Sequence, residues 1–231
     1  MQRIRGVSGP IVGHYRIAAL SGLTTLMGAN APVFSARFAT ALYLRAAILR
    51  LRATALIITP FTSAQEIILQ AQLASGFTVS DTGGTPSIPV AAQNSLLQVS
   101  EVAQVSAFTD IRVAAAAALA AGTRVLDTIP FVAALGCQAL AAASAAVMPI
   151  VADYDVSSDQ RLPVILQGIT PTIGQQAIAG VQPPAPPANI AANAQGIVIS
   201  SAIAQGLAGT VRFLIEMEWV EFATNSSEVI N

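Results

Sequence analysis

Three glutamates near the C-terminal end have the spacing that comes nearest to supporting catalysis: Glu216, Glu218 and Glu221. Glycosidases use one carboxyl group as the acid and a second as the base or nucleophile across the scissile bond. On a strand, Glu216 and Glu218 would share a face and lie about 6–7 Å apart. Charged residues are common on the outer face of a strand, so we expect this pair to oppose Arg50 and Arg52 across a sheet or a subunit contact.

Three aspartates, Asp153, Asp155 and Asp159, have side chains of the kind that bind calcium. Hard cations prefer clustered carboxylate oxygens. The segment has neither a glycine at the bend nor a glutamate at the closing position of a calcium-binding loop. We therefore expect a solvated loop that holds no metal.

Other reactive side chains are scarce. His14 is the only histidine, Cys137 is the only cysteine, and the chain contains no lysine. We expect a structural or surface role for His14 and a buried, unreactive thiol for Cys137, which lies in an apolar run. The G-x-S-x-G, H-E-x-x-H and P-loop patterns are absent from the sequence. The sequence thus predicts no catalytic, cofactor-binding or metal site, and we expect that the chain is not an enzyme.

The composition is poor in charge. Charged residues make up 10% of the chain and hydrophobic residues 54%, whereas ordinary soluble domains are about 25% charged. We expect part of the surface to be buried in subunit contacts; the alternative is a neutral surface of Ala, Gly, Ser, Thr and Gln. A net charge of -1 offers no electrostatic attraction to nucleic acid or anionic lipid, so we expect no nucleic-acid partner.

Two apolar stretches are similar to targeting segments. Residues 17–27 follow several arginines, as the apolar part of a secretory signal would, but His14 and Arg16 lie directly against them, so we expect no cleavage. Residues 129–152 are uncharged and long enough to span a bilayer. Alanine dominates that run, and Pro130 and Pro149 interrupt it. We expect no membrane partner.

The elements that would position the three glutamates are strands. In residues 211–222 the apolar side chains alternate with polar ones, which predicts a strand with one buried face; the buried set is Val211, Phe213, Ile215, Met217 and Trp219. Residues 66–74 alternate more weakly and lead into a turn at residues 80–85. Gly83 and Gly84 allow positive φ in that turn, and we expect a return strand after it.

Further short strands are expected at residues 14–19, 32–38, 108–113, 163–167 and 196–201, separated by turn-forming residues. Residues 39–58 are expected to be mainly strand, with Leu49, Leu51 and Ala53 opposed to Ile48, Arg50, Arg52 and Thr54. Residues 113–121 and 139–152 are rich in alanine, and either a short helix or a strand fits them. The fold class predicted is all-β, an antiparallel β-sandwich or jelly-roll-like single domain with long loops.

We expect residues 1–231 to form one domain. Residues 1–12 would be an N-terminal arm and residues 223–231 a C-terminal tail. Residues 181–192 include four prolines, which cannot join a strand ladder, and are expected to form a stiff loop.

Three blocks of sequence resemble a family of tailed-phage proteins found in marine and environmental phages. The first is Gly-His-Tyr-Arg-Ile-Ala at residues 13–18 with Pro-Val-Phe-Ser-Ala-Arg-Phe at residues 32–38. The second comprises residues 61–66, 76–85 (Gly-Phe-Thr-Val-Ser-Asp-Thr-Gly-Gly-Thr), 109–112 (Thr-Asp-Ile-Arg) and 121–127 (Ala-Gly-Thr-Arg-Val-Leu-Asp). The third comprises residues 193–199 and 216–221. The chain departs from the family pattern at residues 87–98 and 139–151.

The resemblance implies a virion structural protein without catalytic residues. Within that class it favours a capsid cement or decoration protein of a tailed bacteriophage, which stabilises the shell lattice through oligomeric contacts. The alternative is a tail or head-fibre component or a receptor-binding module. The partners implied are copies of the chain itself, with a trimer favoured, and the phage major capsid protein or other virion proteins. The expected location is the virion, assembled in the cytoplasm of the bacterial host.

Overall fold

Alternating apolar side chains produce long strands in the computed structural model, which describes residues 11–38, 44–87, 106–138, 149–156, 163–167, 194–206 and 209–223. The clearest is β12 (Thr210–Ala223). All five apolar side chains predicted for its inner face, from Val211 to Trp219, are buried at 0–1% exposure. The strands predicted at residues 14–19, 32–38, 108–113, 163–167 and 196–201 are present as β1, β2, β6, β10 and β11.

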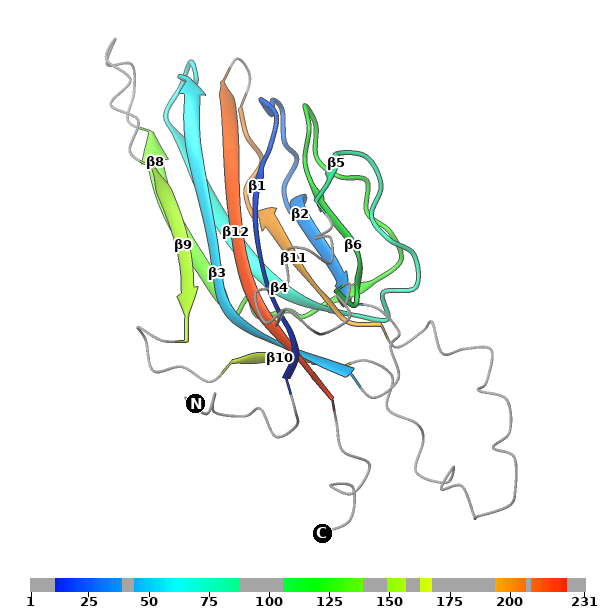
Figure 1. Ribbon diagram of the computed structural model, residues 1–231. Coiled ribbons are helices and arrows are strands. Elements are labelled where there is room, and N and C mark those ends of the chain that lie inside the picture. Colours follow the sequence, from blue (N-terminus) through cyan, green and yellow to red (C-terminus); the bar gives the residue numbers. More distant parts are fainter. Residues whose placement is uncertain are drawn as a thin grey trace, which may run out of the picture.

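The described strands form two antiparallel sheets (Figure 1). Sheet A contains, in order, β1 (Ile11–Leu20), β12 and β3 (Leu44–Thr59). Two short strands, β9 (Ile150–Asp155) and β10 (Val164–Gln167), pair with different parts of β3. Sheet B contains, in order, β5 (Thr85–Pro86), β6 (Phe108–Val113), β2 (Ala31–Phe38), β11 (Gly196–Ser201) and β4 (Gln65–Ser75), with β7 (Val125–Leu126) and β8 (Val132–Gln138) on β4.

The order of these strands along the chain is that of a jelly roll. The chain crosses from β1 in sheet A to β2 in sheet B, returns to β3, and crosses again to β4. After β8 it repeats the alternation through β9, β11 and β12, so that β12 lies between β1 and β3, and β11 lies between β2 and β4. Two interleaved Greek keys of this kind define the fold. The predicted all-β, jelly-roll-like sandwich is confirmed.

One hydrophobic cluster fills the space between the two sheets. Trp219 of sheet A is fully buried, and its ring lies against Tyr15 on one side and edge-on to Phe108 of sheet B on another. The neighbouring Phe38 of β2 meets Phe108 in a second edge-to-face contact. The pair of Trp219 and Phe108 therefore connects the two layers, and such pairs contribute more than their buried area alone.

A β-bulge in β3 reverses the facing of its first half. Opposite β12 the register shifts between Arg50, which pairs with Glu218, and Ile48, which pairs with Trp219. Leu49 is the extra residue, so Ile48 and Leu51 both point into the core, while Leu49 packs on the outer side. The predicted strand is present from Leu44 onward, and residues 39–43 lie outside the described residues. The placement of Ile48 and Leu49 was wrong, because one inserted residue exchanges the two faces.

The turn at residues 80–85 also differs from expectation. Gly83 and Gly84 do adopt positive φ, at 77° and 65°. The strand that follows, β5, pairs with β6, at the opposite edge of sheet B from β4. The predicted hairpin return onto β4 is therefore wrong: hydrogen bonds to β6 hold this segment instead.

The alanine-rich segments are not helical where they are described. Residues 114–121 form bends and a single bridge, Thr82 to Ala120. Residues 150–152 belong to β9, and residues 139–148 lie outside the described residues. No helix occurs in the described ranges, and so none that could span a membrane. β1 begins at Ile11 and β12 ends at Ala223, inside the expected arm and tail, and the proline-rich loop at residues 181–192 is not described.

Candidate functional site

The outer face of sheet A carries a row of side chains whose charge changes sign at every strand. Glu218 of β12 lies opposite Arg16 of β1 on one side and Arg50 of β3 on the other. Arg50 in turn lies opposite Asp155 of β9. From β1 to β9 the row reads positive, negative, positive, negative. Oppositely charged cross-strand neighbours of this kind stabilise a sheet modestly.

A second row lies one step along the strands. Glu216 lies between Ala18 of β1 and Arg52 of β3, and Arg52 lies opposite Asp153 of β9. The expected opposition of Glu216 and Glu218 to Arg52 and Arg50 is therefore confirmed. We call these two lines of residues, Arg16–Glu218–Arg50–Asp155 and Ala18–Glu216–Arg52–Asp153, the charged rows.

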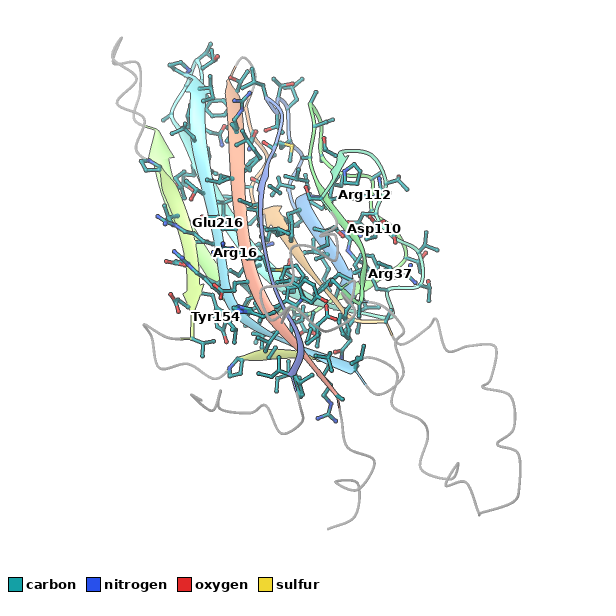
Figure 2. All side chains as sticks on the ribbon, viewed as in Figure 1. Arg16, Arg37, Asp110, Arg112, Tyr154 and Glu216 are labelled. Carbon is teal, nitrogen blue, oxygen red and sulfur yellow. The ribbon has the colours of Figure 1, made fainter. Side chains whose placement is uncertain are left out.

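The charged rows remain accessible to solvent. Arg16 and Asp153 are exposed, and Glu216, Arg50 and Arg52 are half-buried. Figure 2 shows Arg16 and Glu216 over sheet A, which no described element covers in Figure 1. Exposed ion pairs contribute at most about 1 kcal/mol each to folding stability. The charged rows therefore lie on a solvent-facing side of sheet A and need contribute little to folding.

The arginines of this face are incompletely satisfied within the described part of the chain. The Nε atoms of Arg50, Arg52 and Arg212 are each buried and have no hydrogen-bond partner there. His14 lies at the edge of the face, and its Nε2 is 2.6 Å from Oε1 of Glu218. The predicted structural or surface role of His14 agrees with this position on β1.

An apolar band continues the same face beyond the charged rows. Leu20 lies opposite Leu214, and Leu56 lies opposite Arg212. Leu20 is 54% exposed, Leu56 37% and Ile58 42%. Exposed aliphatic side chains that gather beside charged ones mark contact surfaces more often than isolated ones do. We define the charged rows and this band, Leu20, Leu56, Ile58 and Leu214, as the sheet A face.

Glu221 does not belong to this face. It follows Trp219 by two residues and points into the sandwich, where it is 2% exposed. Its carboxylate accepts hydrogen bonds from Ser106 Oγ at 2.6 Å, from the Ala107 N–H at 2.9 Å and from Trp219 Nε1–H at 3.0 Å. Glu221 does not share a face with Glu216 and Glu218, because the strand period places it on the opposite side of the sheet.

Burial of this carboxyl group changes its acidity. Desolvation raises the pKa of Glu221, and the hydrogen bonds from Ser106, Ala107 and Trp219 oppose that rise. The pKa of Tyr15 is raised to about 12, first by its own burial and second by the charge of Glu221. The carboxyl group of Glu221 is buried, and within the described residues its hydrogen-bond partners are Ser106, Ala107 and Trp219.

A buried ion pair holds the segments that cover the outer face of sheet B. Asp81 is 0% exposed and Arg124 5% exposed at the side chain, and Arg124 Nη1 donates to Asp81 Oδ1. The Gly122 N–H also donates to that oxygen, at 2.8 Å, and Arg124 lies over the ring of Phe77. Burial lowers the pKa of Arg124, against the opposing effect of Asp81.

This ion pair joins two pieces of the second sequence block. Asp81 comes from residues 76–85, and Gly122 and Arg124 come from residues 121–127. A Cβ atom at Gly122 would lie 2.0 Å from the Val79 carbonyl oxygen, so only glycine allows the two segments to approach. These pieces therefore have a structural role, which their order in the sequence did not indicate.

The remaining residues considered from the sequence, the three aspartates and Cys137, form no site in the described part of the chain. Asp153 and Asp155 lie on strand β9 beside arginines, so the loop expected there is wrong; Asp159 lies outside the described residues. Within the described ranges no three His, Cys, Asp or Glu residues form a group that could hold a metal ion. Cys137 belongs to β8 opposite Glu66, and the surroundings of its side chain are not described.

Comparison with known proteins identifies no relative of this chain. No protein-family model, no curated protein and no solved structure matches the chain significantly. The sheet A face is thus the candidate functional site on its geometry alone.

Proposed function

We propose that the chain is a structural protein of a tailed-phage virion, and that it acts as a capsid cement or decoration protein. It binds its own copies and the capsid lattice through broad contacts in which no single residue dominates. The observation that carries the proposal is the sheet A face, which combines exposed leucines with balanced charges on an otherwise charge-poor chain. The sequence blocks that resemble phage virion proteins support the same assignment.

The fold is compatible with this role without selecting it. Jelly rolls occur in viral capsid proteins, in lectins and in cupins, and a fold alone does not define a function. A receptor- or glycan-binding module would need an exposed aromatic platform. The large aromatic side chains Trp219, Tyr15, Phe34, Phe38 and Phe108 are buried, and the large exposed apolar side chains in the described ranges are all aliphatic.

The mechanism would be stabilisation of the shell by many weak contacts. Each subunit contact of modest area contributes little by itself. When many subunits bind one lattice, the contacts act together, and the combined affinity greatly exceeds that of one contact. No single residue would then dominate binding.

The proposal is tested with particles. Quantitative mass spectrometry should find hundreds of copies of the chain in each particle, and purified protein should bind particles that lack it and delay their release of DNA on heating. A dozen or fewer copies would instead assign the chain to the tail or a fibre. Failure to bind such particles, together with absence from purified virions, would reject a virion role.

A further inference from the structure

The first charged row is antisymmetric about its centre. About a line that runs between β12 and β3, its two halves are opposite in sign: Glu218 on one side corresponds to Arg50 on the other, and Arg16 corresponds to Asp155. A two-fold axis along this line, parallel to the strands, places each residue of one copy against its counterpart in a second copy. Every charge in the row then meets a charge of opposite sign.

We propose that the sheet A face pairs with the same face of a second copy of this chain about that axis. Glu218 of each copy would oppose Arg50 of the other, and Arg16 would oppose Asp155. The inference rests on the proposed function in one respect, since it requires that the chain assembles through contacts between subunits.

The second charged row fits the same axis. Glu216 lies on β12 and Arg52 on β3, at equal distances from the axis. Glu216 of each copy would therefore oppose Arg52 of the other copy. Ala18 would lie against Asp153 of the second copy, so the Asp153 carboxylate would meet neither an attractive nor a repulsive charge across the interface. Arg50 and Arg52 are half-buried, and the exposed parts of their side chains would lie next to the incoming glutamates.

The charges also exclude the other simple arrangement. A two-fold axis across the strands would stack the first row on the second row of the other copy. Glu218 would then face Glu216, and Arg50 would face Arg52, so like charges would meet at both strands. Repulsion of this kind selects one partner orientation against another.

The apolar band continues the contact. In the next row along the strands, Leu20, Leu214, Thr54 and Val151 lie opposite one another across β1, β12, β3 and β9. Under the proposed axis Leu20 meets Val151 of the second copy, and Leu214 meets Thr54. Burying these side chains supplies the non-directional part of the attraction.

The area of the face suits a weak contact that repetition strengthens. Strands spaced about 4.8 Å apart and about 27 Å of β12 define roughly 500 Å² on each copy. Stable dimers bury about 800 Å² on each partner. A trimer needs a different, heterologous contact, so the paired faces would join separate oligomers within a larger assembly.

The test uses two variants of the whole chain that repel themselves and attract each other. The first, Glu216→Lys/Glu218→Lys, makes β12 positive, so that it would face the positive β3 of its own kind. The second, Arg50→Glu/Arg52→Glu, makes β3 negative, so that it would face the negative β12 of its own kind. In a mixture, however, each altered strand meets a strand of opposite sign.

Sedimentation velocity should show that each variant alone associates at least about tenfold more weakly than the wild type. An equimolar mixture should recover the wild-type association. Loss of ion pairs within one subunit cannot produce that recovery, because each chain keeps its own defect. Far-UV circular dichroism should show that both variants remain folded.

Two outcomes would overturn the inference: variants that associate as the wild type does, or a mixture that stays as dissociated as its components. If the double variants unfold, the single changes Glu216→Lys and Arg52→Glu provide the same test and leave the bond between His14 and Glu218 intact. If either of these two outcomes occurred and the variants still bound particles at the wild-type copy number, the paired face would be refuted and the virion role would stand.

Discussion

At the scale of single residues, burial removes the most hydration from three charged groups: Glu221 and the pair of Asp81 and Arg124. Each lies where water cannot reach it, at 2% exposure or less for the two acids. A buried charge is tolerated only when hydrogen bonds or an opposite charge compensate its lost hydration. Glu221 relies on hydrogen bonds alone, whereas Asp81 has a guanidinium partner.

Glu221 should make folding stability depend on pH. Its pKa in the folded protein is raised by burial, so its contribution to stability is fully present below the ordinary pKa of glutamate and is lost as pH rises through the raised value. As pH rises above the ordinary pKa of glutamate, loss of this contribution should lower the melting temperature. Glu221→Gln should flatten this fall.

A second variant at the same site should act in the opposite direction. The hydroxyl of Ser106 lowers the pKa of Glu221 through its hydrogen bond. Ser106→Ala should raise that pKa further and steepen the loss of stability with pH. Thermal melts of the wild type and both variants across the same pH range would measure these slopes; equal slopes in all three would contradict the assignment.

Asp81 should contribute far more to folding stability than Asp110, which also pairs with an arginine. Asp81→Asn leaves Arg124 charged and buried, and removal of one partner of a buried ion pair costs about 3–5 kcal/mol. The control is Asp110→Asn, because the Asp110 and Arg112 side chains are 14% and 30% exposed, and a partly solvated pair is worth about 1 kcal/mol or less. Urea unfolding would compare the two; equal losses would contradict the structural role of Asp81.

At the scale of elements, the turn before β5 offers a matched pair of glycines. Both Gly83 and Gly84 have positive φ, but only at Gly84 would a Cβ atom meet the backbone, 2.3 Å from the Val113 carbonyl oxygen. Gly83→Ala should cost about 1 kcal/mol, the strain of a side chain in that conformation. Gly84→Ala should cost more than twice as much, because β5 must move away from β6. Chemical denaturation would measure both.

How far an element could be predicted from sequence depended on whether its information was local. The apolar inner face of β12 from Val211 to Trp219 was predicted correctly, since the alternation is a property of that segment alone. The bulge at Leu49 was not, because the extra residue is recognisable only against Glu218 and Trp219 of the partner strand. The pairing of β5 with β6 was missed for the same reason, because it depends on a segment far along the chain.

The candidate site was predictable to a similar degree. Glu216, Glu218, Arg50 and Arg52 were expected to oppose one another, because their alternation fixed the face and the charges suggested the pairing. That Arg16 and Asp155 complete the row depends on β1 and β9 lying at the two sides of the same sheet. Only the topology supplies that order.

At the scale of the whole molecule, the two sheets share one core. The cluster between them contains Ile197 of sheet B and Ile215 of sheet A, both at 0% exposure, together with Trp219. Trp219 is the only tryptophan in the chain, so its fluorescence reports unfolding from a fixed position in sheet A. A domain with one core should unfold in one cooperative step.

This predicts that a cavity in either sheet is felt at the same reporter. Ile197→Ala and Ile215→Ala should each lower the free energy of unfolding by about 2–5 kcal/mol, with one transition and an unchanged dependence on denaturant. The control is Val125→Ala, whose side chain is 67% exposed and should leave stability within about 0.5 kcal/mol. If Ile197→Ala shifted the circular dichroism signal but left the Trp219 transition unmoved, the sheets would unfold separately, and sheet A could present its outer face without support from sheet B.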